Sequence, residues 1–309
     1  FPPLSSRTEA LVALSQDPSP TVLVFYAGDF RSGAAAWQEH AVEDERSGRL
    51  ALAAADWSQV ARCYTALGEI EAAQSAYHRA VSLAARLAGP SRYALQVVGA
   101  RDELRLALDQ EWDASLAEMT GIVAQSAPEN RWALAAVRAA GARIYARLGR
   151  ADESLRLLGA LLEPLRRADS ASLNYPRVAC DAAATLWLLK RTDHLDEIER
   201  SVRDKVVIPD IRYPSFDGRL ALARLCALTE RYAEAEDWFA RAHELYEEQG
   251  ARTLNAIADF DQASMYLARG QPGHMEDARV WREKASSQFR EIGMTGWITR
   301  ADEIAASFA

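Results

Sequence analysis

The chain has 309 residues, of which 49% are apolar and 26% are charged, and this balance is typical of a soluble, packed protein. Its formal net charge of −8 argues against a general nucleic-acid surface, because such a surface would carry a clustered excess of Lys and Arg. The longest apolar runs, such as residues 21–27, are far shorter than the ~18–20 residues that a membrane-spanning helix needs.

The cysteines indicate a reducing compartment. Cys63, Cys180 and Cys226 are far apart in the chain, odd in number, and form no Cys-x-x-Cys pair. This pattern is typical of buried, reduced thiols, so we expect a cytoplasmic protein. The N-terminal stretch FPPLSSRTEA contains neither a Met nor the apolar segment of a signal peptide. We therefore interpret the chain as part of a longer protein.

In chain order, the composition favours helix nearly throughout, because Ala and Leu are abundant and few windows alternate with period two. Residues 22–26 fit either a strand or a buried helical turn, and the surrounding sequence favours the helix. The clearest pattern follows in residues 56–80, where Gly68 is expected to form a tight turn between two helices. Small and aromatic side chains lie on both sides of this turn at helical spacing, so each helix presents one stripe. The stripes consist of Trp57, Ala61, Tyr64, Ala73, Tyr77 and Ala80.

The same frame recurs along the chain, and this recurrence predicts a repeat architecture. Around Gly270 a Gln-Pro-Gly insertion shifts the small residues of the second helix to Ala278 and Ala285. Turns are predicted near Gly28, Gly68, Gln110, Gly149, Asp193, Glu230 and Gly270, at separations of 37 to 44 residues. Tryptophans at packing positions of this frame are Trp37, Trp57, Trp112 and Trp297.

This frame resembles the tetratricopeptide repeat, whose first helix carries Trp, Leu-Gly and Tyr and whose second carries Ala, Phe and Ala. The period is near forty rather than ~34 residues, and the closing proline of the family is mostly missing. The resemblance implies an all-α, right-handed superhelix of about seven helix-turn-helix units over residues 1–287. A C-terminal capping helix of the same domain is expected over residues 288–309.

The end of the chain carries a second resemblance. Its Ile-Gly-Met-x-x-Trp-x-x-x-Ala pattern, within residues 288–304, is similar to the tail of certain multidomain bacterial regulators. These regulators are ATPases linked to class III nucleotide cyclases, and activators of the maltose-regulon or LuxR type. The resemblance implies a non-catalytic sensor module that follows an ATPase domain in the same chain. A stand-alone adaptor that joins two proteins is the alternative.

Familiar catalytic motifs are incomplete. Gly28 and Gly33 have the spacing of a phosphate-binding loop, but Ala34 and Ala35 stand where a Lys and a Ser or Thr are required. No nucleophile elbow, dinucleotide fingerprint or Cys/His nucleophile pair is present. We therefore predict that the chain is not an enzyme and needs no cofactor.

Metal motifs are incomplete as well. His243 begins a zinc-protease pattern, but Glu247 occupies the place of the second His. Asp259 and Asp261 hint at a calcium loop, yet no glycine provides the bend, and we interpret them as solvated charges. No metal site is predicted.

A binding surface is the remaining class of function. Arg62, Arg143 and Arg224 each precede a predicted turn by six residues, on helices that would line the concave side of a tetratricopeptide-like array. Further candidates for the concave face are Arg147, Trp187, Arg191 and Phe260. If these side chains face inward, they would bind a protein or peptide, or a small anionic effector, rather than nucleic acid or a membrane. Alternatively, the arginines are surface residues that cover apolar positions with their stems.

Overall fold

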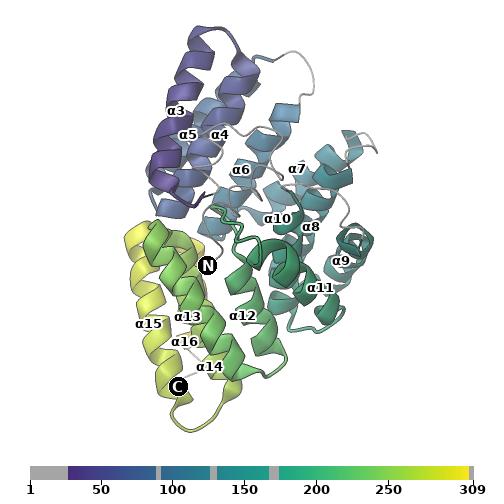
Figure 1. Cartoon of the computed structure of the whole chain (residues 1–309), viewed down its shortest axis with the longest axis vertical. Coiled ribbons are helices and arrows are strands. Elements are labelled where there is room, and N and C mark those ends of the chain that lie inside the picture. The colour runs from purple at the N-terminus through teal and green to yellow at the C-terminus, as the bar shows by residue number, and fades with distance from the viewer. Residues whose placement is uncertain (1–26, 88–91, 126–130, 167–173, 306–309) are drawn as a thin grey trace. The chain divides into compact units, whose positions relative to one another are not determined.

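The structure is a computed structural model that describes residues 27–87, 92–125, 131–166 and 174–305 (Figure 1). Within these ranges every regular element is a helix, which confirms the predicted all-α class. The segment 22–26, for which strand and helix were both considered, lies outside the described residues. None of the helices in the described part of the chain is long and apolar enough to cross a membrane.

The turns between paired helices recur with greater regularity than the sequence suggested. One residue in the left-handed helical conformation marks each turn, and these residues follow one another at intervals of 40 or 41 positions. They are Gly28, Gly68, Asp109, Gly149, Lys190, Glu230 and Gly270. Five of the seven predicted turns are therefore confirmed, and two move, from Gln110 to Asp109 and from Asp193 to Lys190.

A shared hydrogen bond explains why these turns stop one helix and start the next. At the turns of Gly68, Asp109, Gly149, Lys190 and Glu230, the N–H of the residue after the left-handed position donates to the carbonyl five residues earlier, as Glu69 does to Tyr64 at 2.9 Å. Arg231 donates to Cys226 in the same way, also at 2.9 Å. This pairing satisfies a carbonyl that the end of a helix would otherwise leave free.

The described chain forms two compact units, each with its own packed interior. Unit 1 comprises residues 112–242, and unit 2 comprises the two segments 27–111 and 243–305. Unit 1 contains α7 (Trp112–Gln125), α8 (Arg131–Arg147), α9 (Ala151–Arg166), α10 (Asn174–Leu189), α11 (Leu195–Val202), the π-helix η1 (Arg203–Val207), α12 (Gly218–Leu228) and the larger part of α13 (Tyr232–Gln249). Unit 2 contains α3 (Phe30–Arg46), α4 (Leu50–Leu67), α5 (Ile70–Ala84), α6 (Arg92–Leu108), α14 (Arg252–Arg269), α15 (His274–Ile292) and α16 (Thr295–Ala305).

Small residues lie where helices of unit 2 pack closely. Ala61, Ala73 and Ala80 of the best repeat are almost completely buried, as the stripe predicts. The shifted pair Ala278 and Ala285 is fully buried too, which confirms the frame around Gly270. The even-numbered helices are the first members of the hairpins, and successive first helices such as α4 and α6 are packed against one another.

The four tryptophans predicted to pack between helices do so. Trp57 and Trp297 are buried, and Trp37 and Trp112 lie partly buried against apolar clusters. The end of the chain differs in one detail from the prediction. Residues 288–292 still belong to α15, and the capping helix α16 begins only at Thr295, because the left-handed Gly293 ends α15.

Candidate functional site

In unit 1, two arginines share one buried carboxylate, on helices that are the first members of their hairpins. Nη1 of Arg143, on α8, lies 2.8 Å from Oδ1 of Asp181, on α10. Nε of Arg177, one turn earlier on α10, lies 3.6 Å from Oδ2 of the same carboxylate. The side chain of Asp181 is only 2% exposed, whereas those of Arg143 and Arg177 are 15% and 14% exposed. Both arginines are therefore partly exposed beside one buried carboxylate.

A third arginine, Arg224 of α12, approaches the same place. Burial raises the pKa of the Cys180 thiol well above its ordinary value, and Asp217 and Asp181 add to the rise. Arg224 and Arg143 act on the same thiol in the opposite sense, so both guanidinium groups lie near Cys180. We call Arg143, Arg177, Asp181 and Arg224 the arginine face.

The repeat explains why these arginines meet. Arg143 and Arg224 each lie six residues before a left-handed turn residue, Gly149 and Glu230, so they have the same register on α8 and α12. The equivalent residue of the intervening helix α10 is Ala184, which is buried. Since α10 packs against both α8 and α12, a small residue there leaves room for the two long side chains. The position six residues before each turn therefore places two of the three predicted arginines, Arg143 and Arg224, near the same thiol.

The third predicted arginine, Arg62, has a different environment. It belongs to unit 2, is 5% exposed, and directs Nε to both carboxylate oxygens of Glu103 at 3.1 Å. Its Nη2 also donates to the carbonyl of Gln96 at 3.0 Å. Glu103 lies six residues before Asp109, so the pair joins equivalent positions of two successive repeats. Arg62 is thus a buried ion-pair residue rather than the exposed arginine that the concave-face prediction assumed.

The remaining predicted residues are dispersed. Trp187 is buried on α10 under Lys190, whose Nζ lies 3.4 Å from the ring centre. Arg191 is exposed and forms an ion pair with Asp193 at 2.8 Å. Phe260 is buried in unit 2, and Arg147 is half-buried at the end of α8. A binding role for these four residues stays a prediction.

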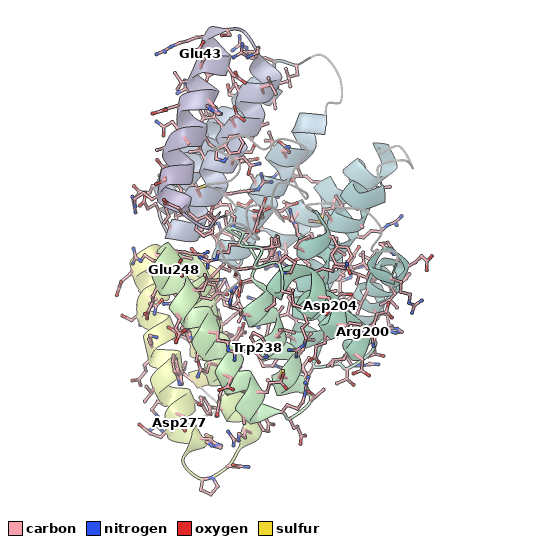
Figure 2. The ribbon with its side chains drawn as sticks, in the orientation of Figure 1. Glu43, Arg200, Asp204, Trp238, Glu248 and Asp277 are labelled. Carbon is pink, nitrogen blue, oxygen red and sulfur yellow. The ribbon has the colours of Figure 1, made fainter. Side chains whose placement is uncertain are left out.

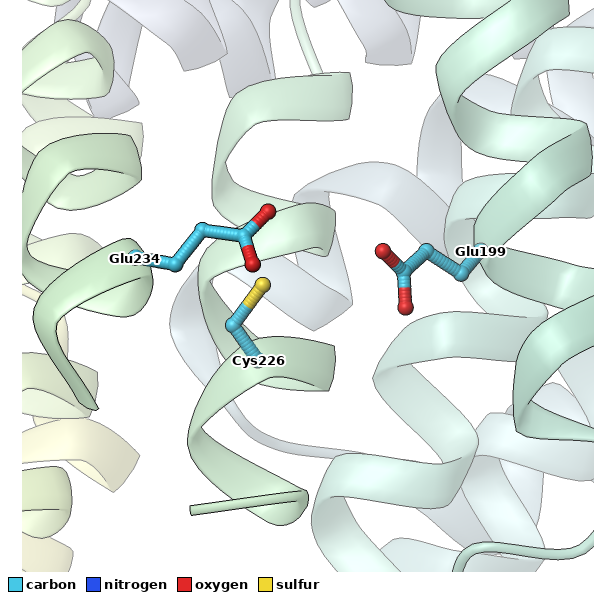
Figure 3. Close-up of side chains that lie close together, drawn as sticks. All are labelled: Glu199, Cys226 and Glu234. Carbon is cyan, nitrogen blue, oxygen red and sulfur yellow. The ribbon is translucent and has the colours of Figure 1, made fainter. Parts of the chain in front are cut away.

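A second cluster in unit 1 has the composition of a metal site. The side chains of Glu199, Cys226 and Glu234 converge from α11, α12 and α13 (Figure 3), with their candidate ligand atoms within 4.8 Å of one another. Burial raises the pKa of Cys226 to about 12, so the thiol stays protonated at neutral pH. A protonated thiol is a poor metal ligand.

Arginines already occupy both carboxylates of that cluster. Arg231 forms ion pairs with Glu199 and with Glu234, and Arg203 reaches the same two residues at 2.8 and 3.1 Å. Burial tends to raise the pKa of Glu199, but hydrogen bonds from the two arginines outweigh it and lower the pKa. The guanidinium of Arg203 also lies over the ring of Trp238, which Figure 2 labels on α13. The cluster therefore works as an ion-pair network that ties three helices together.

A third cluster lies in unit 2 and corrects the reading of two aspartates as solvated charges. Asp259 is fully buried and Asp261 is 3% exposed. The Asp259 carboxylate contacts Lys284 Nζ at 3.1 Å and Gln288 Nε2 at 2.7 Å, and His243 Nε2 lies 3.5 Å away. Burial raises the pKa of Asp259, while the charges of His243 and Lys284 act against the rise.

The sequence contains a pattern from which this third cluster could have been predicted. Asn255, Asp259 and Gln262 are spaced by four and three residues, so they share one face of α14. The two amide residues flank His243, with Asn255 Oδ1 2.7 Å from Nδ1 and Gln262 Oε1 3.0 Å from Nε2. The His243 ring is stacked on Trp281, with ring centres 5.3 Å apart. A polar stripe on an otherwise apolar helix therefore marked a buried hydrogen-bond network.

The three clusters differ in what they can do chemically. The second and third have charges that their own neighbours largely balance, and they stabilise helix packing. The arginine face combines several guanidinium groups with partial exposure, which suits recognition of a carboxylate or phosphate. No protein-family model and no curated protein matches the chain, so the geometry of its own residues carries the functional argument.

Proposed function

We propose that the chain is a non-catalytic regulatory module that binds an acidic protein segment or a small anionic effector at the arginine face. The observation that carries this proposal is the convergence of partly exposed arginines from α8, α10 and α12. The guanidinium groups of Arg143 and Arg177 both lie beside the Asp181 carboxylate, and the charge of Arg224 acts on the neighbouring Cys180. The nearby Asp217 forms its own ion pair, with Arg219 at 3.1 Å.

Asp181 would serve as a positioning residue for the ligand. A carboxylate that holds two arginines in place reduces the side-chain entropy that they lose when an anion binds. Because the arginine face is only partly exposed, its charges are screened less by solvent than those of a surface lysine. A ligand carboxylate or phosphate would therefore pair with arginines that are already oriented.

The wider context of the proposal follows the resemblance of the C-terminal segment. The module would be the sensor part of a bacterial signalling ATPase or transcriptional regulator and would relay occupancy to the ATPase in the cytoplasm. Buried thiols at Cys63, Cys180 and Cys226 support a reducing compartment. A helical-repeat fold by itself does not establish this role. A stand-alone adaptor would use the same face, and an ATPase or DNA-binding domain encoded upstream of Phe1 would argue against it.

Binding of an acidic probe tests the arginine face directly. We would measure the anisotropy of a fluorescein-labelled hexaglutamate peptide, and its displacement by inorganic pyrophosphate, at two salt concentrations. Loss of Arg143 and Arg224 in the double variant R143A/R224A is expected to weaken binding by roughly tenfold or more, since charge-assisted hydrogen bonds contribute about 1.5–3 kcal/mol each.

A matched variant controls for net charge. Arg156 and Arg200 are exposed on α9 and α11, so R156A/R200A removes the same charge from unit 1 without touching the arginine face. Its affinity should stay within about twofold of the unmodified chain, because exposed charges contribute little. Equal weakening by both double variants, or no binding by the unmodified chain, would contradict the proposed site. Deleting the module from a full-length ATPase, and finding an unchanged ATPase rate, would contradict the relay.

A further inference from the structure

Unit 2 is assembled from two segments that are far apart in the chain. Residues 27–111 supply α3 to α6, and residues 243–305 supply α14 to α16. In repeat arrays each repeat normally contacts only its neighbours in sequence. Here α14 packs against α4, and α16 packs against α6, so helices of late repeats contact helices of early ones.

The first junction joins the end of α4 to the start of α14. The backbone carbonyl of Thr65 lies in the last turn of α4 and accepts a hydrogen bond from the Thr253 hydroxyl, which lies in the first turn of α14. Packing around the junction is tight, since a Cβ at Gly68 would lie 3.2 Å from Ile292 and 3.3 Å from Arg252. A side chain of one segment thus caps a helix of the other.

The second junction repeats this arrangement one helix further along. The carbonyl of Leu106, in the last turn of α6, accepts a hydrogen bond of 3.3 Å from the indole N–H of Trp297, near the start of α16. Gly296 makes the closest approach, because a Cβ there would lie only 2.1 Å from the carbonyl oxygen of Asp109. Arg300 Nε adds a long-range attraction to the Asp109 carboxylate at 4.0 Å.

Helix ends explain why these junctions are favourable. The last carbonyls of a helix lack partners within it. Thr65 and Leu106 each accept one hydrogen bond from their own turn, at the N–H of Gly68 and of Asp109, and the junctions add a second from the other segment. Each junction also brings the partly negative C-terminal end of one helix to the partly positive N-terminal end of another. The junctions therefore combine polar contacts between helix ends with local apolar packing, since Ile292 lies against Gly68 and Leu67 lies against Gly250.

Each side of the junctions has an apolar core of its own. The N-terminal side packs around buried residues such as Trp57, Ala61 and Ala80. On the C-terminal side, Phe260, Phe289 and Trp297 of α14, α15 and α16 form an aromatic cluster, with ring centres 5.4 to 6.2 Å apart. Each side can therefore keep its internal packing when the junctions part.

We propose that the two junctions form a latch, from which α14, α15 and α16 release as one body, together with the end of α13 that His243 joins to them, while both sides remain helical. The latch gives unit 2 a closed and an open state, whose balance shifts toward whichever state a ligand prefers. It lies wholly within unit 2, so it stands independently of the arginine face in unit 1.

Spin labels on the two sides would report the two states. Ser75 of α5 and Ser287 of α15 are exposed, so S75C/S287C places one label on each side of the latch. The native Cys63, Cys180 and Cys226 are buried, and the chain without the added cysteines shows whether they react. Pulsed dipolar spectroscopy would then measure the distribution of label distances.

Gly296→Ala is the sharpest test. An added methyl collides with the Asp109 carbonyl but favours helix formation in α16, because Ala is a better helix former than Gly. We expect a new population at longer label distance, with helix content by circular dichroism unchanged. In α9, a Cβ at Gly159 would meet nothing within 4 Å, so Gly159→Ala is the matched control and should leave the label distances unchanged.

A milder variant keeps the test decisive if Gly296→Ala perturbs folding. Thr253→Val removes only the hydroxyl of the first junction and should raise the open population by roughly three- to tenfold. Ser264→Ala, which removes a bond made within α14, should not. A single unchanged distance in Thr253→Val and Gly296→Ala would overturn the latch. Loss of helix in step with the longer distance would overturn it as well, because the junctions would then belong to one indivisible core.

Discussion

Buried charges carry much of the specificity of this chain at the scale of single residues. Arg62 and Glu103 are buried almost completely and bind one another across two repeats. Taking two charges out of water is costly, and their attraction offsets the cost only when the hydrogen bonds are satisfied. Here the Gln59 side chain and the Gln96 carbonyl accept two further hydrogen bonds from Arg62. We therefore expect the pair to specify which helices meet more than it adds to stability.

Removing one partner of this pair should be far more harmful than removing both. Arg62→Met leaves the Glu103 carboxylate buried without its cation, and we expect the free energy of unfolding to fall by about 3–5 kcal/mol. In the double variant R62M/E103L the loss should shrink substantially, because no uncompensated charge remains. Urea denaturation of the three proteins would measure this, and a double variant as unstable as R62M would contradict the explanation.

Asp56 gives a prediction about pH. Burial, and then the charge of Asp44, raise the pKa of Asp56 to about 7. An unfolded aspartate has a pKa of about 3.9, so between these values the folded chain binds the proton more strongly than the unfolded chain. The contribution of Asp56 to stability is therefore present at low pH and is lost as pH rises from about 4 to about 7.

Asp56→Asn removes the group that titrates. At pH 8 the variant should be more stable than the unmodified chain by about 1–2 kcal/mol, a discounted figure because the side chain keeps contact with solvent. At pH 4 the difference should largely vanish. Urea denaturation at both pH values measures it, and Asp237→Asn, which changes an exposed carboxylate of α13, serves as control. A difference in stability that is the same at both pH values would contradict a raised pKa of Asp56.

At the scale of elements, the left-handed turn residues are the most regular feature. Gly149 and Glu230 occupy equivalent turns, with φ of 72° and 59°. Side chains other than glycine are strained in this conformation. A Cβ at Gly149 would meet nothing within 4 Å, so any effect of Gly149→Ala isolates the backbone strain.

The two turns should therefore respond in opposite directions. We expect Gly149→Ala to lower the free energy of unfolding by about 1 kcal/mol and Glu230→Gly to raise it by about 0.5 kcal/mol. Thermal and urea unfolding would measure both changes. Loss of stability in Glu230→Gly would show that its side chain, rather than its backbone, matters in that turn.

At the scale of the whole molecule, hairpins between helices adjacent in sequence occur together with contacts between segments that are far apart in the chain. Within unit 1, α8 and α9 are joined by a short turn, whereas Thr65 and Thr253 of unit 2 are 188 residues apart. Contacts between distant segments form slowly, because loop closure costs entropy before the contacts are gained. We expect amides of α8 and α9 to gain protection earlier in refolding than those that begin α14. Pulsed hydrogen exchange would measure the order, and simultaneous protection would contradict it.

The sequence alone determined the helices, the approximate turns and the packing roles of Trp57, Ala61 and Ala80. These features depend on spacings of three, four and about forty residues, which are visible in one chain. It also placed Arg143 and Arg224 in equivalent positions, and the structure brings them to the same thiol.

Only the tertiary structure decided which charged residues became buried and which ends of the chain met. Arg62 had the same register as Arg143 and Arg224, but its partner Glu103 lies 41 residues away on the neighbouring first helix. The sequence predicted that Asp259 is a solvated charge, but in the structure Lys284 and Gln288 of the next helix bind its buried carboxylate. The junctions of α4 with α14 and of α6 with α16 correspond to no periodic pattern in the sequence. Burial and closure depend on partners that are distant in sequence, and local spacing does not record them.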